Sequence, residues 1–274
     1  MPKARVRTIG PTGLTQPGSE IGDSNIEMLK NSYITTSWDD GNVLDFRIAE
    51  MLTKHGLRGT FYIPREASTG VMSESQVREL SSSFEIGAHT MRHVFLDTAN
   101  DSLAEREIRD SKAWIEEITG NPCPMFCPPG GKFNATHMAQ IKASGFAALR
   151  SVELLSVDPP RLENGLIVMP TTLQAHPHGV ATYARNIAKR RAWRNLWLYV
   201  THGHSTQWEK LTHALLEVVR QRGGVFHLWG HSWELEQASQ WERLENVLSF
   251  LGTAAKNIAC LTNGELCALP PEIN

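Results

Sequence analysis

From Tyr33 onward, short runs rich in β-branched and aromatic residues alternate with longer amphipathic runs. This alternation predicts a mainly parallel sheet with covering helices, either open or closed into a barrel. The expected strands are 32–38, 59–63, 84–88, 124–127, 146–152, 166–170, 196–201 and 224–229. The expected helices are 44–55, 74–82, 102–118, 134–144, 180–192, 207–222 and 239–254.

The alternation leaves the first part of the chain uncovered. Residues 1–30 are rich in Gly, Pro, Ser and Thr and show no periodicity, so we expect an irregular arm. Residues 31–274 are then expected to form one domain, because a chain of 274 residues can bury a single sizeable core. The four cysteines have neither the density of a disulfide framework nor the CxxC pairing of a structural zinc site.

The composition argues against several partners. The net charge of −2 gives the chain no global attraction to nucleic acid or to an anionic membrane. No stretch approaches the ~20 consecutive apolar residues of a membrane span. The first ten residues lack the apolar region of a signal peptide, which predicts a cytoplasmic location, or a periplasmic or secreted one if the N-terminus was trimmed.

Five expected strands run directly into polar or glycine-rich segments. These segments are Asp39-Asp40-Gly41, His89-Thr90, Pro128-Pro129-Gly130-Gly131, His202-Gly203-His204 and Gly230-His231. In parallel α/β sheets and barrels, active sites gather at the carboxyl ends of the strands. We therefore expect Asp and His side chains to converge on one face of the domain.

Two of these segments carry potential metal ligands. His89 and His93 stand four residues apart in HTMRH, and a helical turn would place both rings on one face. A carboxylate from the Asp39-Asp40 pair would complete a two-His, one-carboxylate set with an open position, as in catalytic zinc sites. Taken alone, the acidic pair also fits a solvated turn, and the histidine spacing also fits a coincidence.

Four motifs together resemble the polysaccharide deacetylase (NodB-homology) family. They are SWDDG (37–41), HTMRH (89–93), CPPGG (127–131) and the apolar run GVFHLWGHSWE (224–234). The resemblance extends from about Tyr33 to the LTNGE segment at 261–265. It implies a distorted (β/α) barrel with about seven strands.

The resemblance also implies roles and an activity. Asp39 matches the catalytic base, Asp40, His89 and His93 match the metal ligands, and His231 matches the general acid. The implied metal is Zn²⁺, with Co²⁺ or Ni²⁺ as alternatives that suit the same ligands. The implied reaction removes an N-acetyl or O-acetyl group from an amino sugar or polysaccharide.

Further residues are expected to contact the substrate. A backbone N–H near Gly130 or Gly131 is expected to hold the oxyanion, and aromatic rings stack on sugar faces. The substrate-binding candidates are Pro129, Gly130, Gly131, Trp229, Trp233 and His204. Glu234, three residues after His231, is a candidate to orient that ring.

One motif departs from the family pattern. The third motif normally begins with an arginine that pairs with the base carboxylate, and this chain has Cys127 there. We hypothesise that Arg150 supplies the guanidinium instead; the alternative is that Arg150 is a surface charge. The Asp-Trp pair of the family's fourth motif is also not evident around 152–160.

Two other functions stay open at this point. HSWELE resembles the ending of allantoinase-like relatives, which predicts hydrolysis of a small amide. A catalytically silent carbohydrate-binding barrel is the second alternative. The presence of Asp39, Asp40, His89, His93 and His231 together argues against it, because a silent protein has no chemical need for all five.

Overall fold

The computed structural model describes residues 31–202 and 205–270, so the expected N-terminal arm and His204 lie outside the described residues. The strands are β1 (Ser32–Asp39), β2 (Thr60–Ile63), β3 (Glu85–Ala88), β4 (Met125–Phe126), β5 (Ala148–Arg150), β6 (Arg161–Glu163), β7 (Leu166–Met169), β8 (Leu173–Gln174), β9 (Gly224–Gly230) and β10 (Ala259–Cys260).

The helices are α2 (Asp45–Lys54), α3 (Glu74–Ser81), α4 (Asp101–Thr119), α5 (Ala135–Ala143), α6 (Val180–Arg190), α7 (Trp193–His202), α8 (Trp208–Arg222), α9 (Ser232–Gln237), α10 (Trp241–Ala254) and α11 (Asn263–Cys267). Two short 3₁₀ turns, η1 (Leu96–Thr98) and η2 (Pro129–Gly131), complete the described elements. All seven expected helices are confirmed to within a few residues.

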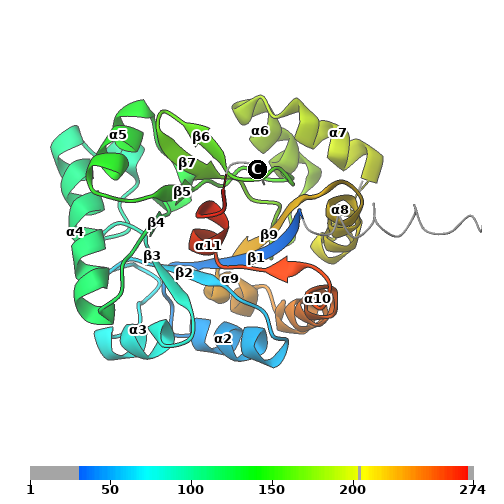
Figure 1. Ribbon diagram of the computed structural model, residues 1–274, viewed down its shortest axis with the longest axis horizontal. Helices are drawn as coiled ribbons and strands as arrows, with labels where there is room; N and C mark the ends of the chain where they lie inside the picture. Colours follow the sequence, from blue (N-terminus) through cyan, green and yellow to red (C-terminus); the bar gives the residue numbers. More distant parts are fainter. Residues whose placement is uncertain (1–30, 203–204, 271–274) are drawn as a thin grey trace, which may run out of the picture.

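The strands form one curled sheet with helices outside it (Figure 1). Its order is β6-β7-β5-β4-β3-β2-β1-β9-β8, and β10 adds to β1. The stretch 166–174 pairs with β5 through β7 and with β9 through β8, so it connects the two ends of the strand order. If β7 and β8 are counted as one strand and the attached β6 and β10 are set aside, seven strands remain. This is the number expected for the distorted barrel.

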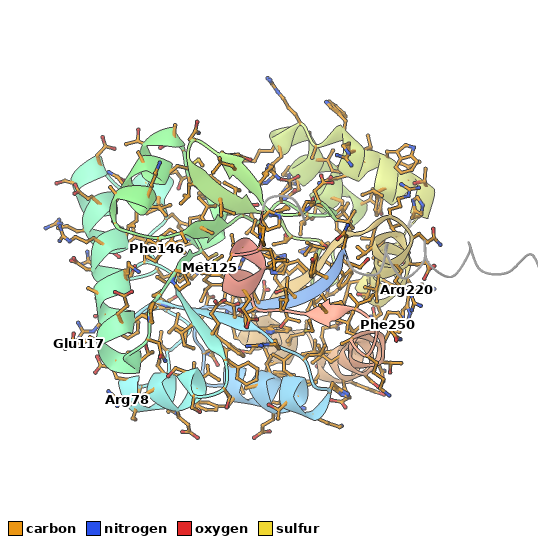
Figure 2. All side chains as sticks on the ribbon, viewed as in Figure 1. Arg78, Glu117, Met125, Phe146, Arg220 and Phe250 are labelled. Atoms are coloured by element: carbon orange, nitrogen blue, oxygen red, sulfur yellow. The ribbon has the colours of Figure 1, made fainter. Side chains whose placement is uncertain are left out.

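Two apolar cores follow from this curvature. The larger core lies between the strands and the surrounding helices. The smaller core fills the barrel, where Tyr62, Met125 and Met169 pack against Leu266 and Cys267 of α11. Figure 2 shows Met125 beside α11 at the centre of the ring, whereas Arg78 and Glu117 lie at the periphery. Alternating strand residues therefore face the barrel interior and the helices in turn.

Helix α11 closes one end of the barrel with polar contacts as well as apolar ones. Asn263 accepts a hydrogen bond from Thr35 Oγ1 at 3.0 Å and donates one to Tyr62 Oη at 3.1 Å. Its backbone N–H donates to Thr60 Oγ1 at 2.9 Å. These bonds satisfy buried polar groups that the apolar interior would otherwise leave unpaired.

One expected strand is wrong. Residues 196–201 belong to helix α7, so His202 ends a helix and is not at a strand end. The run contains aromatic and β-branched residues and is apolar on the outside of the helix as well as the inside, which hides the helical period. Four of the five expected strand ends remain. No described helix is long and apolar enough to cross a membrane.

Candidate active site

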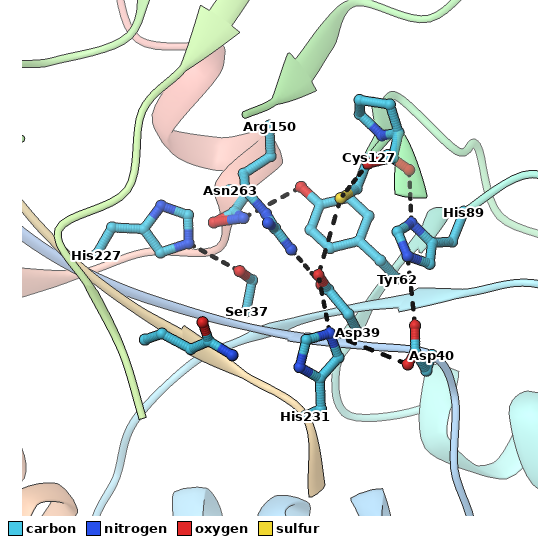
Figure 3. Close-up of polar contacts among 12 residues, drawn as sticks. Ser37, Asp39, Asp40, Tyr62, His89, Cys127, Arg150, His227, His231 and Asn263 are labelled. Atoms are coloured by element: carbon cyan, nitrogen blue, oxygen red, sulfur yellow. Dashed lines mark hydrogen bonds and ion pairs between the residues drawn. The ribbon is translucent and has the colours of Figure 1, made fainter. Parts of the chain in front are cut away.

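Strand β1 delivers two buried carboxylates to the carboxyl end of the barrel (Figure 3). Asp39 is its last residue, and Asp40 follows with φ +78°, a left-handed conformation that is costly for a non-glycine residue. The Asp40 N–H donates to Tyr62 O at 3.1 Å, which holds this turn against β2. Gly41, with φ +63°, continues the turn where any Cβ would lie 2.6 Å from Ile63 Cγ2. The turn separates the two carboxylates so that they can do different work.

The segment after β3 brings His89 and His93 together without a helical turn. His93 has φ +52°, and the two imidazole rings lie 5.0 Å apart between centroids. Glu107 of α4 is buried and holds this loop: its Oε2 accepts the N–H groups of Met91 and Arg92, each at 2.9 Å. No motif contains Glu107, and its role could not be predicted because it depends on the packing of α4 against β3.

Asp40, His89 and His93 offer three ligand atoms within 4.8 Å of one another. Asp40 Oδ1 lies 3.5 Å from His89 Nε2 and 3.1 Å from His93 Nε2. It is buried and has no hydrogen-bond donor among the described residues. Such an orphaned carboxylate oxygen, directed at two imidazole nitrogens, fits a divalent cation.

The protonation of the ligands supports the same reading. His89 Nδ1–H donates to Cys127 O at 2.5 Å, which leaves Nε2 with its lone pair toward Asp40. Burial would raise the pKa of Asp40, but the imidazoles of His89 and His93 beside its Oδ1 outweigh it and hold the pKa well below its usual range. Asp40 is therefore an anion, as a metal ligand must be.

Arg150 lies in the barrel interior and forms an ion pair with Asp39 Oδ1. Its side chain is fully buried, which excludes the alternative of a surface charge. The guanidinium carbon lies 5.1 Å from the ring centroid of Tyr62 and 4.8 Å from that of Trp229. The two aromatic rings and the carboxylate together make a place for the cation in an otherwise apolar interior.

Cys127 occupies the position of the family arginine and stays a neutral thiol. Burial is the main cause that raises its pKa well above the ordinary value. Its Sγ lies 3.9 Å from Asp39 Oδ2, on the side of the carboxylate away from the Arg150 contact. A guanidinium at either position could therefore reach Asp39.

His231 faces both carboxylates from the end of β9. Its Nε2 lies 4.0 Å from Asp39 Oδ2 and 4.0 Å from Asp40 Oδ2, and its Nδ1–H donates to Glu234 Oε2 at 2.6 Å. Burial would lower the pKa of His231, but the Glu234 hydrogen bond and the two aspartates raise it to about 9. The ring is therefore protonated at neutral pH. Gln174 donates to the same Glu234 oxygen at 2.7 Å and extends the network to β8.

The substrate-binding candidates fall into different places. Trp233 is partly buried and donates its Nε1–H to Asp40 Oδ2 at 2.9 Å. Trp229 is only 6% exposed and packs on Arg150 and on the edge of His231, so it holds these groups in place and has no free face for a sugar. His204 lies outside the described residues.

A phenylalanine that the motifs did not single out stands beside the metal ligands. Phe95 is 38% exposed, and its ring lies 5.7 Å from that of His93 between centroids. It also lies over Gly130, where an added Cβ would come within 2.9 Å of it. The sequence contains no signal that identifies Phe95 as a site residue, because a single phenylalanine in a loop has no distinctive pattern around it.

The CPPGG segment forms the tight turn η2 next to this ring. Pro129 and Gly131 are buried, and Gly130 is exposed. The Gly131 N–H already donates to Pro128 O at 2.8 Å, which leaves the Gly130 N–H as the candidate oxyanion donor of the pair.

Replacing Gly131 by alanine is expected to destabilise the protein by about 2–4 kcal/mol. Its φ is +60°, and the new Cβ would lie 2.3 Å from Val152 Cγ2. Urea unfolding measures the loss. Gly70→Ala is the matched control, because Gly70 has φ +79° with nothing within 4 Å of the added Cβ. Equal losses in the two variants would show that the contact with Val152 carries no cost.

Residues 28–149 match the family model described as Polysaccharide deacetylase. This span contains both aspartates of β1, the two histidines after β3 and the CPPGG turn. Over these residues, which are less than half of the chain, the sequence is similar to the polysaccharide deacetylase family. The family expectation drawn from the four motifs is confirmed, and so is its barrel fold.

Three relatives illustrate the similarity. A peptidoglycan-N-acetylglucosamine deacetylase from Bacillus cereus is 28% identical over 116 residues, which are 41% of this chain and 53% of that protein. The matched region thus spans about half the length of that relative. A Mycobacterium smegmatis structure assigned to the polysaccharide deacetylases has a TM-score of 0.62 and 14% identity, and covers 95% of this chain and 94% of its own.

The third relative is a family 4 acetyl xylan esterase from Clostridium thermocellum, in complex with a cobalt ion. Its structure has a TM-score of 0.53 and 16% identity, and covers 85% of this chain and 89% of its own. At these identities the two structures show a shared fold, and the chemistry of this chain must be argued from its own residues.

Proposed function

We propose that the protein is a metal-dependent deacetylase that hydrolyses the N-acetyl group of an amino sugar within a polysaccharide or its precursor. The observation that carries the proposal is the meeting of Asp40, His89 and His93 with Asp39 and His231 at one end of the barrel. The Bacillus cereus relative, a peptidoglycan-N-acetylglucosamine deacetylase, supports the amino-sugar substrate.

Asp40, His89 and His93 are the residues that would hold the metal. A bound Zn²⁺ would supply Lewis-acid polarisation of the acetyl carbonyl and a lowered pKa for water. The cobalt ion of the Clostridium thermocellum esterase supports a divalent metal in this fold, and Co²⁺ or Ni²⁺ suits the same ligands.

Asp39 is the proposed general base. Its Oδ1 is held by Arg150, which leaves Oδ2 to face His231 and to accept a proton from the attacking water. Arg150 fixes the orientation of the carboxylate, as the family arginine would from the position of Cys127. We therefore assign Arg150 as the partner of the base.

His231 is the proposed general acid. An amine leaves an amide poorly unless it is protonated, and the charged His231 carries that proton on Nε2, 4.0 Å from the base carboxylate. The Gly130 N–H would donate to the oxyanion during attack. Phe95, beside the His93 ring, and Trp233, hydrogen-bonded to Asp40, are the proposed contacts for the sugar ring.

The test is acetate release by the zinc-loaded protein from chitooligosaccharides, peptidoglycan fragments, acetylated xylan and allantoin. Release from the amino-sugar substrates, lost in Asp39→Asn, is the expected result. Release from allantoin alone would favour small-amide hydrolysis. A protein that retains no zinc after loading and releases no acetate would favour a silent binding barrel. The comparisons support neither alternative.

The rate of deacetylation is expected to fall as the pH rises through the pKa of His231, about 9. The sign follows from its role: the acid works when protonated, so activity is present below this pKa and is lost above it. Glu234→Gln removes the hydrogen-bonded carboxylate that raises the pKa, so the alkaline limb should move to lower pH. The pH profile of kcat/KM measures the shift.

Glu236→Gln is the control for this prediction. It makes the same change of charge on the same helix, α9, but Glu236 lies at the surface and contacts Arg47 and Trp241 instead of His231. If both variants moved the alkaline limb equally, the hydrogen bond from His231 to Glu234 would not be the cause of the shift.

A further inference from the structure

Helix α7 turns an apolar face away from the domain. Its inward residues, Asn195, Leu198 and Tyr199, are buried. Its outward face carries four large apolar side chains: Trp193 (66% exposed), Leu196 (36%), Trp197 (49%) and Val200 (51%). Their spacing places them in one stripe along the helix. In Figure 1 this helix lies at the outer edge of the molecule, beside α6.

The charge around this stripe is one-sided. No acidic residue occurs between Glu163 and Glu209, whereas the same stretch holds five basic residues: Arg185, Lys189, Arg190, Arg191 and Arg194. The net charge of −2 for the whole chain conceals this local excess. The overall charge therefore does not describe the surface that α6 and α7 present.

Several of these cations are available to a partner. Arg185 and Lys189 on α6 and Arg191 at its C-terminus are exposed and form no ion pair with another described residue. Arg222 of α8 lies over the ring of Trp197, 5.1 Å from its centroid, and adds a cation at the edge of the stripe. Arg194 pairs with Asp158 at 3.3 Å but keeps an 84% exposed side chain.

We propose that the stripe and these cations form a docking surface for an anionic phospholipid membrane. Tryptophan, leucine and valine on one face with Arg and Lys beside them are the pattern of a helix that lies in the interface of a bilayer. Anionic headgroups attract the cations, and the apolar side chains enter the acyl boundary. The attachment is peripheral, and it is independent of the proposed deacetylation.

The charge also argues against two other occupants. A second copy of the chain, docked through the same face, would bring two basic surfaces together, which is unfavourable. A neutral polysaccharide would stack on the tryptophans but would gain nothing from the arginines and lysines. Only a surface that is both anionic and apolar uses every component.

The experiment is flotation of the full chain with vesicles of phosphatidylcholine, alone or mixed equally with phosphatidylglycerol. A charge variant, Arg185→Gln/Lys189→Gln/Arg191→Gln, and a stripe variant, Trp193→Ser/Trp197→Ser, are compared with the wild type. The matched control is Lys54→Gln/Arg58→Gln/Lys256→Gln, which removes three exposed cations from another face. Thermal unfolding verifies that each variant is folded.

The wild type should float with the mixed vesicles and not with phosphatidylcholine alone, and added salt should weaken binding. The charge variant should need about 100-fold more lipid for half-binding, from roughly a factor of five for each cation. The stripe variant should stay in solution, and the control should behave as the wild type. If the stripe variant does not fold, the charge variant still decides.

Four results would overturn the proposal. The wild type could fail to float with anionic vesicles. The control could lose as much binding as the charge variant. Light scattering without lipid could show a dimer that the stripe variant abolishes, or the protein could be retained on insoluble chitin through Trp193 and Trp197, which would assign the stripe to a second copy or to a polysaccharide.

Discussion

Asp40→Asn is expected to abolish stoichiometric zinc binding and to lower acetate release by more than about 100-fold. Replacing a residue that only hydrogen-bonds to a metal ligand already lowers metal affinity or activity by about 10–100-fold. The substitution keeps the shape of the side chain, and a neutral amide oxygen replaces the anion that faces His89 and His93. Elemental analysis of the purified variant and an acetate assay measure the two effects.

Asp45→Asn is the matched control. Asp45 is buried near the same carboxylates, and burial raises its pKa well above the ordinary value, which favours the neutral form that asparagine resembles. It accepts a hydrogen bond from Ser232 Oγ at 2.5 Å, and an asparagine oxygen can accept the same bond. An Asp40→Asn protein that retained one zinc and full activity would contradict the assignment of Asp40 as a ligand.

Arg150→Ala is expected to destabilise the protein by about 3–5 kcal/mol, because it leaves the Asp39 carboxylate buried without its counter-ion. The rate of deacetylation should fall with it, since Asp39 would lose the guanidinium that orients its carboxylate. Urea unfolding and steady-state kinetics measure the two losses. Arg161→Ala is the control: its pair with Glu153 is partly exposed and should contribute at most about 1 kcal/mol.

The double variant Cys127→Arg/Arg150→Ala tests the exchange of positions directly. It returns the guanidinium to the place where the family carries it, on the Cys127 side of Asp39. The double variant should be more stable and more active than Arg150→Ala alone. Cys127→Arg alone should destabilise the protein, since it places two guanidinium groups in one buried space. If Arg150→Ala unfolds like the wild type, the ion pair does not support the site.

The short motifs allowed the sequence to indicate much of the site. Asp39, Asp40, His89 and His231 stand at strand ends, and His93 lies in the loop that follows His89. Local spacing and strand order were enough to predict that these residues meet. Their separate roles were predicted from the resemblance to the polysaccharide deacetylase family.

Other parts of the site depend on distant packing. Arg150 was one of two open alternatives until its burial beside Asp39 decided between them. Glu107 of α4 holds the backbone between His89 and His93, Phe95 packs beside the His93 ring, and neither residue stands in a motif. Trp229 was a substrate-binding candidate because aromatic rings stack on sugars, yet its place on β9 buries its ring in the interior.

The error at 196–201 has a physical reason that is itself informative. A helix is recognised in a sequence by the contrast between an exposed polar face and a buried apolar face. In α7 the face that should be polar carries Trp193, Trp197 and Val200, so that contrast is missing. The short strands β8 and β10 were not predicted for a simpler reason, since a strand of two residues has no periodicity to detect.

The closure of the barrel by α11 sets an order of events during synthesis. Asn263 holds Tyr62 through its hydroxyl, and the Tyr62 ring lies beside the Arg150 guanidinium that pairs with Asp39. A nascent chain can therefore have every strand from β1 to β9 outside the ribosome while the surroundings of its base are still unfinished. The catalytic end acquires its final geometry only when α11, made after all of them, seals the opposite end.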